Sequence, residues 1–229
     1  MKKFNRESLK LYMVTDHSLT LAAAAGDESY GQAMERIVSE AVGGGVTMVQ
    51  LREKDLSTRE FVQLALRLKK VLAHCSGPDG HRVPLIINDR IDVALASDAD
   101  GVHIGQSDMP YSLARRILGP DRIIGLSVEN LAQVEEADSL DVDYIGVSPV
   151  FATPTKTDTA APFGIQGLRR AVEMSAHPTV AIGGMNARTA AEVMDTGTDG
   201  IAVVSAIVGA PSPREAAAEL YNIMDGVGK

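Results

Sequence analysis

Hydrophobic residues gather in eight short runs along this chain, and polar segments with a helical period separate the runs. Each run is nearly continuous in hydrophobicity and is bounded by glycine, aspartate or asparagine, as is typical of strands that are covered on both faces. The runs comprise residues 11–15, 48–51, 85–88, 101–104, 123–127, 144–147, 179–182 and 200–204. The pattern predicts parallel strands that alternate with helices.

Helix start signals support this alternation. Ser57 and Glu60 stand at capping-box spacing, and an apolar stripe at helical spacing follows them (Phe61, Leu64, Ala65 and Leu68). Asn130 and Asn186 are expected to cap two later helices. Residues 19–29 predict either a short helix or a loop, and residues 76–82 predict a turn-rich insertion at the bottom of the fold.

Eight strand–helix pairs in 229 residues give roughly 29 residues per unit, about the size of a βα repeat. The length and the uniform composition favour an α/β fold with a single domain, a (β/α)8 TIM barrel. We expect residues 1–10 to form an N-terminal extension, residues 11–207 the barrel and residues 208–229 a C-terminal helix. A doubly wound sheet is the alternative, because strands that alternate with helices do not by themselves show closure.

Charge and cysteine content narrow the function. A formal net charge of −8 argues against broad binding of nucleic acid or a membrane surface, so an anionic ligand needs a local cationic cluster. The single cysteine, Cys75, has no partner for an internal disulfide, and no apolar run has the length of a signal core or a transmembrane helix. These features predict a cytoplasmic protein that acts on small molecules and has no obligatory protein partner.

The first candidate site follows the second apolar run, where Gln50, Arg52 and Lys54 alternate. Alternate residues of an extended segment share a face, so all three side chains can point at one ligand. Arginine and lysine neutralise phosphate oxygens, and glutamine adds amide hydrogen bonds. The alternative is an ordinary surface loop in which Glu53 and Asp55 are the ion-pair partners.

Two carboxylates follow the next two strands. Asp89 ends the third strand region, and Asp108 lies just beyond the fourth. Neighbouring strand ends meet in a barrel, and two carboxylates beside phosphates are a common Mg²⁺ site, because this ion takes few protein ligands and keeps its waters. The alternative is that both aspartates cap the helices that follow them.

A third candidate lies in the long connection of residues 148–164, which contains Thr153, Pro154, Thr155 and Lys156. Long connections in compact barrels are usually functional, and two hydroxyl groups with an ammonium can hold a phosphate. Ordinary turn chemistry also explains a Thr-Pro-Thr sequence.

Glycines mark the fourth candidate. Gly183 and Gly184 follow the seventh strand, and Val204 and Ser205 end the eighth. In this fold a phosphate often lies between these two loops, where glycine permits close approach of the backbone. A pair of glycines alone is a weak signal, and its place after the seventh strand makes it more specific.

The histidines add no base to this picture. His103 lies inside an apolar strand and is interpreted as a packed residue behind the site, while His17 borders the first strand without an assigned role. The chain offers no nucleophile with an adjacent base. This pattern fits a reaction in which a good leaving group departs with metal assistance, while the enzyme positions the reactants and stabilises charge.

Six segments, in this order, resemble the thiamine-phosphate synthase family: residues 11–16, 50–54, 88–89, 101–108, 153–156 and 181–184. The resemblance extends over residues 11–207. It implies a (β/α)8 barrel that joins 4-amino-2-methyl-5-hydroxymethylpyrimidine diphosphate to a thiazole phosphate or carboxythiazole phosphate. The products are thiamine phosphate and pyrophosphate, and the implied cofactor is Mg²⁺. The implied mechanism is dissociative: pyrophosphate leaves first, and the thiazole nitrogen captures the pyrimidine methylene cation.

The resemblance also assigns roles to residues. The diphosphate substrate would be held by Gln50, Leu51, Arg52, Glu53, Lys54, Asn88 and Lys156, with Ser127 in contact with the pyrophosphate. Asp89 and Asp108 would bind the metal. The thiazole phosphate would be held by Thr153, Pro154, Thr155, Gly184, Val204 and Ser205. Arg52, Lys54, Ser127 and Lys156 would be the catalytic residues.

The chain departs from the family pattern at Ser148, where a glycine commonly precedes the proline. Two rival functions stay open. One is a thiazole tautomerase with the same barrel, which would not need the residues for a second, diphosphorylated substrate. The other is a non-catalytic barrel that binds a phosphometabolite, which would need neither Lys156 nor a pair of metal carboxylates.

Overall fold

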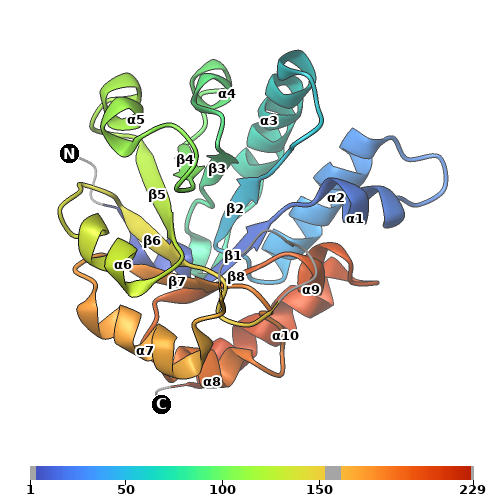
Figure 1. Cartoon of the computed structure of the whole chain (residues 1–229). Helices are drawn as coiled ribbons and strands as arrows, with labels where there is room; N and C mark the ends of the chain where they lie inside the picture. Colours follow the sequence, from blue (N-terminus) through green and yellow to red (C-terminus); the bar gives the residue numbers. More distant parts are fainter. Residues whose placement is uncertain (1–3, 153–160, 228–229) are drawn as a thin grey trace.

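Eight parallel strands close into a barrel in the computed structural model, which describes residues 4–152 and 161–227 (Figure 1). Each strand pairs with its neighbours in the sequence, and β8 pairs with β1. The strands are β1 (Leu11–Val14), β2 (Met48–Leu51), β3 (Leu85–Asn88), β4 (Gly101–Ile104), β5 (Ile123–Val128), β6 (Tyr144–Val147), β7 (Thr179–Ile182) and β8 (Gly200–Val203). Closure confirms the predicted TIM barrel and excludes the doubly wound sheet.

Helices surround the barrel on its outside (Figure 1). They are α1 (His17–Ala22), α2 (Tyr30–Gly43), α3 (Thr58–Ala73), α4 (Ile91–Ala96), α5 (Tyr111–Leu118), α6 (Leu131–Ala137), α7 (Gly164–Met174), α8 (Ala190–Met194), α9 (Ser205–Val208) and α10 (Pro213–Gly226). Two short 3-10 helices, η1 (Arg6–Leu9) and η2 (Pro78–Gly80), precede β1 and β3. The stretch 19–29 is divided, since α1 covers its start and a loop leads on to α2. The insertion 76–82 contains η2 and leads into β3, which places it at the end where the strands begin.

The predicted helix caps have two outcomes. The capping box of Ser57 and Glu60 is confirmed at α3, and the Asn130 side chain accepts a hydrogen bond from the Gln133 N–H ahead of α6. The prediction for Asn186 is wrong. Its side chain accepts from the Arg188 N–H in a separate turn, and α8 begins later, after Thr189.

The hydrophobic core has two layers because strand residues alternate in direction. The inner layer fills the barrel and contains Leu9, Tyr12, Val14, Met48, Ile86, Tyr144, Val180 and Ala202. The outer layer lies between the barrel and the helices and receives the intervening residues, among them Met13, Val49 and Ile87. This alternation decides which residues of each strand can reach a site at the end of the barrel.

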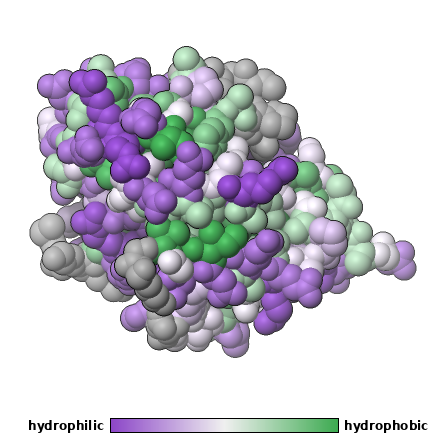
Figure 2. Space-filling view, turned by 90° about the horizontal axis from the view of Figure 1, so that it is seen from below, coloured by the Kyte–Doolittle hydropathy of each residue, from purple (hydrophilic) through white to green (hydrophobic). Residues whose placement is uncertain are grey.

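Among the described residues, the large hydrophobic side chains that are exposed to solvent are Leu21, Leu66, Leu95, Met109, Leu113, Ile117 and Met174. The face in Figure 2 shows small hydrophobic areas that are bordered by hydrophilic residues. Among the described residues, no helix is both long and apolar enough to cross a lipid bilayer.

A repeated hydrogen bond ties the beginnings of the strands together. Thr47, Asp100, Asp143 and Asp199 stand immediately before β2, β4, β6 and β8. Their side chains accept from the backbone N–H groups of Leu11, Leu85, Ile124 and Thr179, respectively, at 2.9, 2.8, 2.8 and 2.8 Å. One such bond therefore joins each odd-numbered strand to the strand that follows it. All four bonds lie at the amino-terminal ends of the strands, on the opposite side of the barrel from their carboxyl ends.

Removal of one of these acceptors should lower stability without affecting activity. Asp100→Ala leaves the buried N–H of Leu85 without its acceptor and also removes the ion pair with Arg82, so we expect a loss of about 1–3 kcal/mol in the free energy of unfolding. Asp92→Ala is the control, because its ion pair with Arg90 is exposed and should contribute less than about 1 kcal/mol. Urea denaturation measures both. Equal losses in the two variants would contradict a special role for these bonds.

Candidate active site

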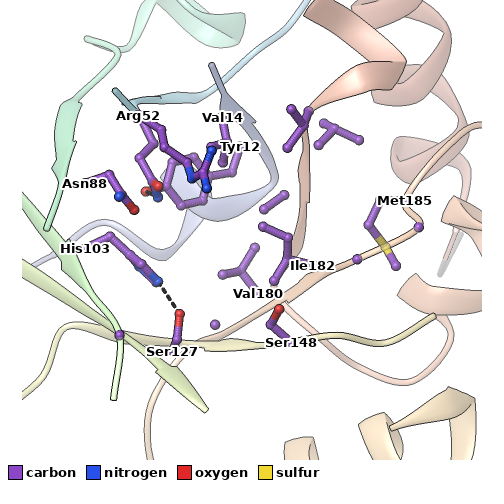
Figure 3. A pocket seen from close by; sticks show the side chains of 18 of the residues that line it. Tyr12, Val14, Arg52, Asn88, His103, Ser127, Ser148, Val180, Ile182 and Met185 are labelled. Carbon is purple, nitrogen blue, oxygen red and sulfur yellow. Dashed lines mark hydrogen bonds between the residues drawn. The ribbon is translucent and has the colours of Figure 1, made fainter. Parts of the chain in front are cut away.

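A cavity of about 810 Å³ lies at the carboxyl ends of the strands. In Figure 3, polar side chains (Arg52, Asn88 and His103) lie on one side of it and apolar side chains (Val180, Ile182 and Met185) on the other. Many of the residues selected from the sequence line this cavity: Gln50, Arg52, Lys54, Asn88, Asp89, Asp108, Ser127, Gly183, Gly184, Val204 and Ser205. The structure therefore brings the ends of β2, β3, β4, β5, β7 and β8 to one cavity.

The side chains of residues 50–54, at the end of β2 and just after it, point alternately into the cavity and toward the outside of the barrel. Gln50, Arg52 and Lys54 line the cavity, as the alternation predicts. Leu51 is fully buried in the outer core layer, and Glu53 is also buried. Because their side chains point away from the barrel axis, Leu51 and Glu53 do not line the cavity.

Glu53 anchors this segment from the outside. Its carboxylate lies 3.0 Å from His17 Nδ1 and accepts a hydrogen bond from the Tyr30 hydroxyl, and the His17 and Tyr30 rings are 4.3 Å apart. Burial raises the pKa of Glu53 above its ordinary value. The alternative of a surface loop is therefore wrong about Glu53. This residue does not pair with Arg52 or Lys54, because its carboxylate is bound by His17 of α1 and Tyr30 of α2 on the outside of the barrel.

Arg52 is the cation best placed for an anionic ligand. Its backbone N–H donates to the Thr15 hydroxyl at 2.9 Å, which fixes the strand end. Its guanidinium group belongs to the cavity wall and has no ion-pair partner among the residues that the structure describes. A cation without a carboxylate partner can bind an anion without first breaking an ion pair.

Asp89 and Asp108 share one corner of the cavity with Lys54. The Lys54 ammonium lies 2.5 Å from the Asp89 carboxylate, and Asp108 accepts from the Gly105 N–H at 2.7 Å. The pKa of Asp108 is raised, first by burial and then by the proximity of the Asp89 carboxylate. Asp89 also has φ of +60°, an uncommon backbone conformation that often marks a functional site.

The alternative role of the two aspartates as helix caps does not hold. Arg90 precedes α4 and Pro110 precedes α5, and neither helix start receives a hydrogen bond from a capping side chain. Two close carboxylates on neighbouring loops suit a hard cation with oxygen ligands. In the described part of the chain, no group of three or more His, Cys, Asp or Glu side chains could hold a metal, so this pair is the smaller kind of carboxylate site.

The loops after β7 and β8 form the opposite wall. Gly183 and Gly184 have φ of +101° and +74°, and a Cβ atom at Gly184 would lie 2.8 Å from Phe151 Cβ. The Gly184 carbonyl accepts from the Asn186 side chain at 3.0 Å. Only glycine fits this backbone without strain, which leaves the main chain exposed to the cavity beside Val204 and Ser205.

Several residues of the cavity wall were not selected from the sequence. Tyr12, Gln106, Glu129, Asn186, Arg188 and Thr189 all contribute to it. Tyr12 could have been found from the alternation of β1, whereas Arg188 lies in a turn that the sequence pattern does not orient. His103 contacts Ser127 and Tyr144, as a packed residue would, but it also lines the cavity and so does not lie behind the site as the sequence interpretation had it. Thr153, Pro154, Thr155 and Lys156 lie outside the described residues.

The family model for thiamine monophosphate synthase matches residues 11–207. The chain belongs to this family. A thiamine-phosphate synthase of Albidiferax ferrireducens is 51% identical over 96% of this chain and 94% of its own length. The corresponding protein of Vibrio campbellii is 49% identical over 94% of this chain and 98% of its own length. A solved thiamine phosphate pyrophosphorylase of Pyrococcus furiosus superposes with a TM-score of 0.83 at 39% identity, covering 98% of this chain and 99% of that one.

In this member of the thiamine monophosphate synthase family, two kinds of anion-binding group face the same cavity. Arg52, Lys54 and the carboxylate pair occupy the wall formed by β2, β3 and β4, and the glycine backbone occupies the wall formed by β7 and β8. The first wall suits a highly charged anion with a metal ion, and the second suits a phosphate that is bound by the backbone. The two walls therefore offer different kinds of group to one cavity.

Proposed function

We propose that the chain is a thiamine-phosphate synthase, a transferase that joins hydroxymethylpyrimidine diphosphate to a thiazole phosphate and releases pyrophosphate. The observation that carries the proposal is the presence of two unlike anion-binding walls in one cavity. A coupling enzyme for two phosphorylated substrates needs both walls. The membership of the chain in the thiamine monophosphate synthase family supports the same reaction.

The diphosphate substrate occupies the wall of β2, β3 and β4 in this proposal. Arg52 and Lys54 bind its terminal oxygens, and Gln50 and Asn88 donate amide hydrogen bonds from the cavity floor. Asp89 and Asp108 would hold a Mg²⁺ ion, which would supply positive charge to neutralise the leaving pyrophosphate. The Lys54 ammonium, 2.5 Å from the Asp89 carboxylate, lies at the same wall and adds a second positive charge there.

The thiazole phosphate occupies the opposite wall. Gly184 presents its backbone, and Val204 and Ser205 complete the wall. Thr153, Pro154 and Thr155 are assigned to the same phosphate and Lys156 to the diphosphate, from the sequence alone, because they lie outside the described residues.

The reaction needs positioning more than acid–base chemistry. The bond between the pyrimidine methylene carbon and the diphosphate oxygen breaks, and the oxygen keeps the electron pair. The thiazole nitrogen supplies the electron pair for the new carbon–nitrogen bond, so no proton has to move. Arg52, Lys54 and Ser127 contribute by stabilising the negative charge of the leaving group.

The test is pyrophosphate release by the purified protein with both substrates and Mg²⁺, followed together with thiamine phosphate formation. Each substrate alone is the control, and isomerisation of the thiazole is followed in parallel. We expect stoichiometric release of pyrophosphate only when both substrates are present. Isomerisation without release of pyrophosphate would instead identify a thiazole tautomerase, and binding without either reaction would identify a non-catalytic barrel.

A further inference from the structure

A chain of hydrogen-bonded side chains crosses the barrel beneath the cavity. Gln50 Nε2 donates to Tyr12 Oη at 2.7 Å, and Tyr12 Oη lies 2.8 Å from Tyr144 Oη. Tyr144 Oη lies 3.0 Å from His103 Nδ1, and His103 Nε2 lies 2.8 Å from Ser127 Oγ, a contact that Figure 3 draws. The five residues come from five different strands, so only the closed barrel brings them into one chain.

The direction of donation along this chain follows from its first bond. Tyr12 Oη accepts from Gln50, and its other hydrogen-bond partner among the described residues is Tyr144. Burial raises the pKa of both phenols above their ordinary value, so both keep their protons at neutral pH. Tyr12 must therefore donate to Tyr144, because the Tyr12 proton is buried and an unpaired buried donor is unfavourable.

The same reasoning continues to the end of the chain. Tyr144 accepts from Tyr12 and donates its own proton to His103 Nδ1. The imidazole then carries its proton on Nε2 and donates it to Ser127 Oγ. An imidazolium at His103 would leave the Tyr144 proton without an acceptor among the described residues. Ser127 accepts at this bond, and its hydroxyl proton has no other partner in the described chain, so it is available to the cavity.

We propose that Tyr144 is a positioning residue: through His103 it orients the Ser127 hydroxyl as a hydrogen-bond donor toward the leaving diphosphate. The inference rests on the proposed function, in which Ser127 contacts that group. A hydroxyl that can only donate matches a pyrophosphate oxygen, which can only accept. It also needs no reorientation when negative charge develops on this oxygen during the reaction.

Packing around Tyr144 holds this series of hydrogen-bonded side chains in place. Tyr144 is fully buried, and its ring stacks on that of His103 with 5.6 Å between the centroids. Gly125 provides the space, since a Cβ atom there would overlap Cζ of the Tyr144 ring. Tyr144 does not belong to the cavity wall, so its hydroxyl can act on a ligand only through its neighbours.

The tautomer of His103 reports the direction of hydrogen-bond donation from Gln50 to Ser127, and it can be measured without any substrate. Nitrogen-15 NMR of the parent should show a neutral imidazole with the proton on Nε2. Gln50→Glu replaces the donor with a carboxylate that can only accept, so every bond should reverse and the proton should move to Nδ1. A proton on Nδ1 in the parent, an imidazolium at neutral pH, or the same tautomer in both proteins would overturn the inference. These outcomes are independent of whether the protein makes thiamine phosphate.

A double-mutant cycle tests the coupling to Ser127. Tyr144→Phe and Ser127→Ala should each lower kcat by about 10- to 100-fold, the effect of one lost hydrogen bond to a charged group, with smaller changes in KM. In the Ser127→Ala background, Tyr144→Phe should cost less than about twofold, because it acts through a hydroxyl that is already absent. Independent losses that multiply would assign Tyr144 a merely structural role.

Tyr111→Phe is the matched control. Its hydroxyl donates to the Asp141 carbonyl at 2.6 Å outside the cavity, so kcat should stay unchanged. Circular dichroism confirms that each variant is folded before kinetics are compared. If Tyr144→Phe does not fold, the tautomer measurements on the parent and on Gln50→Glu still decide the direction of the chain.

Discussion

Asparagine in place of Asp89 or Asp108 should lower kcat by about 100-fold or more, whereas the stability of the fold should change by less than about 0.5 kcal/mol. Substitution of a residue that only orients a metal ligand typically costs about 10- to 100-fold, so loss of a direct ligand should cost at least as much. The fold is spared because asparagine is isosteric. At position 108 it can still accept from the Gly105 N–H, and at position 89 it tolerates the φ of +60°.

The measurement combines steady-state kinetics with thermal denaturation. Mg²⁺ should raise the melting temperature of the parent, because it binds the folded state, and should do so much less in either variant. Asp121→Asn is the control, because Asp121 is exposed, precedes β5 and lies outside the cavity wall. A chelator should abolish turnover by the parent. Full activity of the parent in the presence of a chelator would refute the metal assignment.

The sequence predicted most of the fold because the signals for strands are local. The runs of residues 48–51, 85–88 and 144–147 coincide with β2, β3 and β6, since fully buried parallel strands read as uninterrupted hydrophobic segments. The helix caps were harder. Asn130 caps α6 as predicted, but Asn186 begins a separate turn before α8, and a capping residue alone does not distinguish the two.

The candidate site was predictable to the extent that it follows from the ends of strands. Arg52, Asp89 and Gly183 each come directly after one of the predicted runs, and barrel topology requires such residues to meet. The family resemblance selected the segment 50–54 as a whole, whereas the pleat of the strand turns Glu53 to the outside. The contact between Tyr12 and Tyr144 joins residues that are 132 positions apart on strands that are not neighbours. No local pattern in the sequence predicts a contact between residues so far apart.

Mutations in the two walls should each weaken the binding of a different substrate. Arg52 tests the wall of β2, β3 and β4, and Gly184 tests the wall of β7 and β8. Arg52→Ala removes a charge-assisted contact worth roughly 1.5–3 kcal/mol, so binding of the pyrimidine diphosphate should weaken by about 10- to 150-fold. Binding of the thiazole phosphate should change little. Arg59→Ala is the control, because Arg59 lies on the exposed side of α3 and outside the cavity wall.

Gly184→Ala should show the opposite selectivity, weakening the thiazole phosphate most. The new Cβ atom would lie 2.8 Å from Phe151 Cβ at a φ of +74°, so the loop must shift where its backbone meets the phosphate. Gly80→Ala separates this effect from backbone strain, because Gly80 has the same φ of +74° and a Cβ atom there would meet nothing within 4 Å. Both variants should lose stability, but only Gly184→Ala should lose thiazole phosphate binding. Isothermal titration of each substrate against the four variants is the measurement, and equal weakening of both substrates by Arg52→Ala or by Gly184→Ala would show that the two walls do not act separately.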